Sequence, residues 1–75
     1  MPKLRKVSGE EALRSLQRLG FEKVRQRGSH VVLRKQTEEG EVGCVVRLHR
    51  ELKIGTVKGI LRQAKVTSEA FMDNL

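Results

Sequence analysis

The sequence has no tryptophan or tyrosine, and Phe21 and Phe71 are its only aromatic residues. Domains that bind single-stranded nucleic acid on a sheet or barrel surface, such as RRM and OB domains, stack the bases on exposed aromatic rings. The chain lacks residues for such a platform. Any recognition of nucleic acid should therefore depend on backbone and shape.

Cysteine and long apolar runs are also scarce. Cys44 is the only cysteine, which excludes an internal disulfide, and its neighbours Val42 and Val46 predict a small buried hydrophobic side chain. The chain has no run of 18 or more apolar residues and no signal-peptide pattern. We therefore expect a cytoplasmic protein without membrane contact.

Metal and nucleotide motifs are missing as well. The single cysteine and the two histidines have none of the close paired spacings of zinc ligands. Glu51-Leu52-Lys53 matches a fragment of metal-dependent nucleases, but no acidic residue in an upstream strand completes it, and we interpret it as a solvated charge run. No glycine-rich phosphate loop ends in lysine. We expect neither a metal nor a small-molecule cofactor.

Positive charge is abundant. Sixteen Lys and Arg against nine Asp and Glu give the 75 residues a formal net charge of +7. Such a balance favours a polyanionic partner, with nucleic acid as the default and a merely soluble basic protein as the alternative. The length predicts one small domain over residues 1–75 whose activity lies on the surface or in a shallow groove.

The first predicted element is a helix over about residues 9–19. Ser8 and Glu11 have the spacing of a capping box, and Gly20 stands where a left-handed residue ends a helix. The apolar stripe that should face the core recurs at helical spacing and consists of Ala12, Leu13, Leu16 and Leu19.

Three strands should follow as an antiparallel meander. Residues 21–26 and 30–35 flank Gly28-Ser29, a pair suited to a two-residue hairpin with glycine first. A polar loop at residues 36–40 leads to a third strand at about 41–48, where apolar residues alternate.

A second helix is predicted from Gly55-Thr56 onward, with a short helical turn at the end of the chain. Gly59 inside this helix indicates close packing. Thr67 or Ser68 should cap the last turn, which returns Phe71 to the core. The core stripe of the second helix consists of Val57, Ile60, Leu61 and Ala64. Segregated elements in this order predict a two-layer α+β sandwich with helices on one sheet face and the other face open.

His30 is the main candidate for chemistry. If Val31 and Leu33 point into the helical layer, strand alternation turns His30, Val32 and Arg34 onto the open face. The first strand should contribute Lys23 and Arg25 beside them. Imidazole titrates near neutrality, so it can take a proton from a ribose 2′-hydroxyl or give one to a leaving 5′-oxygen without a metal. The alternative is a surface histidine with no task.

Two further candidates lie later in the chain. His49, after the third strand, could supply the second half of an acid and base pair, or could simply cap or pack. Lys53, Thr56 and Lys58 cluster at the start of the second helix, where free N–H groups and the helix dipole favour a phosphate. An ordinary capped helix with solvated lysines explains the cluster equally well.

Two stretches, RQRGSHVVL at residues 25–33 and LHRELKIGTVKGILRQAKVTSEAF at residues 48–71, together resemble the HicA (YcfA-like) toxin family. The resemblance extends over nearly the whole chain, including the residues around the start and end of the first helix. Two positions depart from it. Arg47 stands where family members often have proline, and Lys65 where glycine is common.

The resemblance implies a fold similar to the double-stranded-RNA-binding domain. It also implies the toxin of a type II toxin–antitoxin system, a metal-independent RNA endonuclease that cleaves mRNA and is inhibited by a HicB-type antitoxin. The catalytic histidine of the family matches His30, and Gly28 and Ser29 match the turn that presents it. The residues that stabilise charge on the phosphoryl oxygens would then be Arg25, Arg27 or Arg34.

Two other functions stay open from the sequence. The chain could be a binding module of the double-stranded-RNA type that uses the same basic face without cutting. It could also be an interaction protein whose basic face receives an acidic partner, with weak and salt-sensitive RNA binding.

Overall fold

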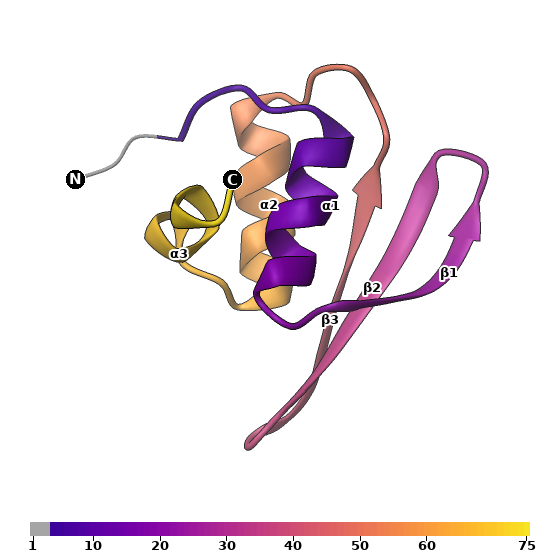
Figure 1. Cartoon of the computed structure of the whole chain (residues 1–75), viewed down its shortest axis with the longest axis vertical. Helices are drawn as coiled ribbons and strands as arrows, with labels where there is room; N and C mark the ends of the chain where they lie inside the picture. Colours follow the sequence, from indigo (N-terminus) through magenta and orange to yellow (C-terminus); the bar gives the residue numbers. More distant parts are fainter. Residues whose placement is uncertain (1–3) are drawn as a thin grey trace.

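A three-stranded antiparallel sheet and three helices form the structure, a computed structural model that describes residues 4–75. The sheet has the order β1-β2-β3, and Figure 1 shows α1 and α2 on one of its faces while the other face carries no helix. This confirms the predicted α+β class and the order of elements, although the first three residues of the predicted domain lie outside the described residues. The elements are α1 (Gly9–Arg18), β1 (Glu22–Arg27), β2 (His30–Thr37), β3 (Gly40–Arg47), α2 (Ile54–Ala64) and α3 (Ser68–Asp73).

The start of α1 is fixed by the predicted capping box. The Ser8 hydroxyl accepts a hydrogen bond from the Glu11 N–H at 3.0 Å, and the Glu11 carboxylate accepts one from the Ser8 N–H at 2.9 Å. That backbone hydrogen bond, together with Arg5, lowers the pKa of Glu11. Because the folded-state pKa is lowered, the charged carboxylate stabilises the helix start above its usual pKa, and this contribution is lost as the pH falls.

The core lies between the helical layer and the inner face of the sheet. Both predicted helical stripes contribute to it, although Leu13 and Leu19 are only partly buried. Phe71 is fully buried, as predicted, and burial raises the pKa of the Cys44 thiol to about 11. The buried apolar residues are Val7, Ala12, Leu16, Phe21, Val31, Leu33, Cys44, Val46, Leu52, Val57, Ile60, Leu61, Ala64 and Phe71.

The strands differ from the prediction at both ends of the sheet. β1 lies within one residue of the strand predicted at 21–26, but all of it is exposed, and Val24 is 46% exposed at a bulge between Lys23 and Arg25. The predicted polar loop at residues 36–40 is mostly strand, because β2 runs to Thr37 and β3 starts at Gly40. Figure 1 shows both regions reaching beyond the helices. Strand without cover carries no apolar periodicity, so the sequence pattern did not reveal the outer part of the β2–β3 hairpin, whereas β1 was predicted from the turn that follows it.

One local interpretation of the sequence is wrong and another holds only in part. Glu51 and Lys53 are exposed, as expected for a solvated charge run, but Leu52 between them is 2% exposed, and its N–H donates to the carbonyl oxygen of Val7 at 2.7 Å. This bridge holds the segment before α2 beside the entry to α1. A Cβ atom added to Gly59 would meet nothing within 4 Å, so that glycine does not mark close packing.

Lys65 ends α2 in a left-handed conformation, with φ 56° and ψ 42°. A side chain there costs about 1–2 kcal/mol, which glycine avoids at some expense in unfolded-chain entropy. We expect Lys65→Gly to raise the free energy of unfolding by about 0.5–1 kcal/mol, measured by urea denaturation. Lys65→Ala removes the charge but keeps the Cβ atom, so an equal gain from both variants would contradict a backbone origin.

Candidate active site

His30 is exposed at the start of β2, directly after the two-residue turn. Gly28 has a φ of +58°, which a side chain would disfavour, while Ser29 does not share the positive φ; this is the pattern of a type II′ hairpin. The N–H of Leu48 donates to the carbonyl oxygen of Ser29 at 2.8 Å. The turn is therefore tied to the chain that leaves β3, and His30 is presented from a braced corner of the sheet.

The register places an arginine on each side of His30. Arg27 lies opposite it on β1 and Arg47 lies opposite it on β3. Directly opposed residues of antiparallel strands share a sheet face, with Cβ atoms about 4.5–5.5 Å apart. Since Val31 and Leu33 are fully buried, the shared face of His30 and the two arginines is the open one, as predicted for His30.

Two basic residues of β1 lie on opposite sheet faces. Arg25 is opposite Val32 and therefore on the open face, two residues along the strand from the level of His30. Lys23 is opposite the buried Leu33, so it belongs to the other face, and its ammonium group donates to the side chain of Gln26 at 3.2 Å. The bulge inserts one residue between them and breaks the simple alternation. The suggested place of Lys23 beside His30 is therefore wrong.

Arg34 shares the open face but not the neighbourhood of His30. Four residues separate them along β2, which corresponds to about 13 Å. The Arg34 Nε atom also lies 3.2 Å from a carboxylate oxygen of Glu41. Of the predicted arginines, the structure thus brings Arg27 next to His30, places Arg25 at intermediate distance and leaves Arg34 away from it.

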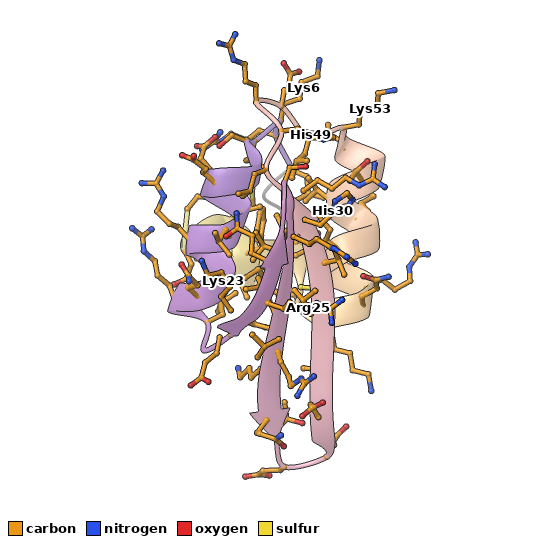
Figure 2. All side chains as sticks on the ribbon, turned by 90° about the vertical axis from the view of Figure 1, so that its right-hand side faces the viewer. Lys6, Lys23, Arg25, His30, His49 and Lys53 are labelled. Carbon is orange, nitrogen blue, oxygen red and sulfur yellow. The ribbon has the colours of Figure 1, made fainter. Side chains whose placement is uncertain are left out.

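A surface depression next to this corner joins the end of β3 to the start of α2. It contains His49, Lys53 and Thr56, and Arg47 extends it toward His30. Glu51 also lines it, and its carboxylate is paired with the ammonium group of Lys6 at 3.1 Å. Figure 2 looks onto the open sheet face and shows His49 and Lys53 above His30. The predicted helical lysine Lys58 is exposed but does not line the depression.

The start of α2 lies at the edge of the same depression. The helix begins at Ile54, one residue before the predicted start at Gly55, so Lys53 is its N-cap residue. No side chain caps the helix. The first turn carries no acidic residue, so the positive end of the helix dipole is not neutralised by its own side chains. The start of α2 could therefore bind a phosphate. It is not the ordinary capped helix that was the alternative prediction, because no side chain caps it.

Gly9 determines how closely α1 approaches this corner. Its N–H donates to the carbonyl oxygen of His49 at 2.8 Å. A Cβ atom at Gly9 would lie 2.0 Å from the carbonyl oxygen of Arg47 and 2.6 Å from the Cα atom of Leu48. Only glycine fits here, and its absent side chain lets the first turn of α1 brace the chain that carries Arg47 and His49.

Arg47 is the residue that reasoning from the sequence missed. The signal was present, because the two-residue hairpin fixes the start of β2 and alternation fixes the face of each residue. To pair Arg47 with His30, however, the register of β3 against β2 must be counted from the true strand ends at Thr37 and Gly40. The polar sequence around the turn does not reveal these ends. Arg47 joins His30 to the depression, so it belongs to the candidate site.

The described residues offer neither a cluster of metal ligands nor a membrane-spanning helix. Across residues 4–75, no group of three or more His, Cys, Asp or Glu side chains could hold a metal ion. None of the helices in that part of the chain is long and apolar enough to cross a membrane.

Comparison with known proteins gives one family. The family model described as the HicA toxin of bacterial toxin–antitoxin systems matches residues 9–66, which include every candidate residue named above. A search of curated proteins finds no match.

Proposed function

The chain belongs to the HicA toxin family of bacterial toxin–antitoxin systems, and from this premise we propose that it is an RNA endonuclease that cleaves mRNA in the cytoplasm. The observation that carries the proposal is the position of His30. Its exposed imidazole lies at a braced hairpin corner and can transfer a proton, and Arg27 and Arg47 on either side of it can bind a phosphate.

The proposed reaction is an internal transfer at the RNA phosphate. The ribose 2′-oxygen attacks the adjacent phosphorus and loses its proton, while the bond from phosphorus to the 5′-oxygen breaks and the leaving oxygen gains a proton. His30 serves as the base or the acid in this exchange. The products are a 2′,3′-cyclic phosphate, which hydrolysis opens to a 3′-phosphate, and a 5′-hydroxyl. His49 is the candidate for the second proton transfer.

The shape and charge of the open face support RNA as the substrate. The formal net charge is +7, and Arg25, Arg27 and Arg47 all lie on the uncovered side of the sheet. Cationic groups attract the phosphates of any sequence, so binding should weaken steeply with salt. Neither phenylalanine is available there for base stacking, because Phe21 and Phe71 are buried, and the sequence has no tyrosine or tryptophan.

We further propose that a HicB-type antitoxin inhibits the protein by covering the open face. The helical layer occupies only one side of the sheet, so the side that carries His30 stays accessible to a second protein (Figures 1 and 2). A partner with acidic groups opposite the arginines would compete directly with RNA.

Incubation of the purified protein with a defined RNA in EDTA tests the proposed function. We expect fragments with 5′-hydroxyl and cyclic or 3′-phosphate ends, and no cleavage of the same strand with 2′-O-methyl groups, because the nucleophile is then blocked. Addition of the HicB-type antitoxin should stop cleavage. RNA that is shifted in a gel yet stays intact would instead favour the non-catalytic binding module.

A further inference from the structure

The arginine that contacts the phosphate under attack can be identified from the sheet register. Building on the proposed ribonuclease function, we infer that Arg47 binds the non-bridging oxygens of the scissile phosphate and stabilises the charge that develops there. Arg25 and Arg27 then guide the RNA rather than act in the reaction, whereas Arg34, paired with Glu41 and distant from His30, has neither role.

Position along the strands limits the choice to two arginines. A phosphate within reach of the His30 imidazole lies within reach of residues directly opposite His30, which are Arg27 and Arg47. Arg25 lies opposite Val32, about 7 Å farther along the strands. Arg34 is about 13 Å away along its strand and is held by Glu41. None of the ion pairs within residues 4–75 involves Arg47, so its guanidinium is available to an anion.

Rigidity distinguishes Arg47 from Arg27. Arg27 ends β1, an edge strand that is exposed along its whole length. The backbone around Arg47 is fixed from two sides, by the hydrogen bond from Leu48 to Ser29 and by the close approach of Gly9. Charge stabilisation in a transition state requires groups that are already in place, because any reorganisation would cost part of the benefit. The braced arginine therefore fits the catalytic role better.

The surroundings of Arg47 extend the path of the RNA. Arg47 lines the depression that also contains His49, Lys53 and Thr56. A strand whose scissile phosphate lies between His30 and Arg47 would pass its neighbouring phosphate toward the uncapped start of α2. Guanidinium can bind two phosphoryl oxygens at once, which the ammonium group of lysine cannot reproduce in the same geometry.

Single-turnover cleavage by Arg47→Ala tests this inference, with Arg27→Ala and Arg34→Ala as matched controls. We expect Arg47→Ala to lower the cleavage rate about 100-fold or more, as removal of one transition-state donor does. Binding of the uncleavable 2′-O-methyl RNA should weaken far less, since the contact strengthens in the transition state. Arg47→Lys should recover part of the rate, and Arg34→Ala should stay close to the wild type.

A phosphorothioate at the cleavage site distinguishes a direct contact of Arg47 with the phosphate from a role of Arg47 in the stability of the fold. Sulfur in place of one non-bridging oxygen should slow the wild type for one diastereomer, and Arg47→Ala should lose this discrimination, which a structural defect would leave intact. If the wild type cuts but Arg47→Ala cuts as fast as Arg34→Ala, or discrimination persists, the inference about Arg47 is wrong. If the wild type cuts nothing, the proposed nuclease function fails first and the inference falls with it.

Discussion

His30→Ala should abolish detectable RNA cleavage, with a loss of about 10²- to 10⁴-fold if a residual rate can be measured. The imidazole is the only side chain at the hairpin corner suited to move a proton near neutral pH, because its neighbours on both strands are arginines. Single-turnover cleavage of a defined RNA in EDTA measures the effect.

The fold should not change in this variant. His30 is exposed, and no hydrogen bond or ion pair of its side chain occurs among residues 4–75. Thermal unfolding and binding of 2′-O-methyl RNA should therefore match the wild type. His49→Ala is the informative comparison: a loss as large as that of His30→Ala would assign the two histidines to one acid and base pair. Full activity of His30→Ala would exclude the proposed mechanism.

The helical layer could be predicted from the sequence because α1 has a capping box at its start and both long helices have a distinct buried face. The spacing of Ser8 and Glu11 predicts a capping box, and the structure contains it. The stripe from Val57 to Ala64 admits one orientation of α2, with the opposite face in water. Local chemistry and burial agree in these elements, so the pattern is sufficient.

The edges of the sheet could not be predicted in the same way. The outer half of the β2–β3 hairpin and the whole of β1 have no helix over them, so neither burial nor alternation marks them. The Gly28-Ser29 turn was enough to predict β1, but not its bulge, and nothing marked the outer half of the hairpin. The bulge at Val24 is a further difficulty, because it changes the face of Lys23 without a recognisable residue such as glycine. Tertiary hydrogen bonding alone fixes these segments.

The candidate site was predicted in part for the same reasons. Alternation next to the buried Val31 turned His30 outward, and the Gly28-Ser29 turn fixed its place at a corner. The contribution of Arg47 depends on pairing between strands, and that of Gly9 on contact between α1 and β3. Such contacts join residues far apart in the chain, and single-sequence periodicity does not report them.

Among the glycines of this protein, Gly9 should tolerate substitution by alanine least. The new Cβ atom would overlap the carbonyl oxygen of Arg47 and press on the Cα atom of Leu48, and neither backbone atom can rotate away as a side chain would. We expect a loss of about 3 kcal/mol in the free energy of unfolding. For a domain of this size, that corresponds to a fall in Tm of roughly 12–24 °C.

Activity should fall as well, even at temperatures at which Gly9→Ala remains folded. The displaced chain carries Arg47, and Leu48 holds the Ser29 carbonyl beside His30, so a shift at Gly9 separates the groups that act on the phosphate. Gly59→Ala is the matched control, because its Cβ atom enters open space inside α2, where alanine stabilises a helix by about 0.5–1 kcal/mol relative to glycine. We therefore expect opposite shifts in Tm from the same chemical change, with RNA cleavage unaffected by Gly59→Ala. Equal behaviour of the two variants would mean that α1 does not brace the active corner, and that the position of Arg47 depends on the sheet alone.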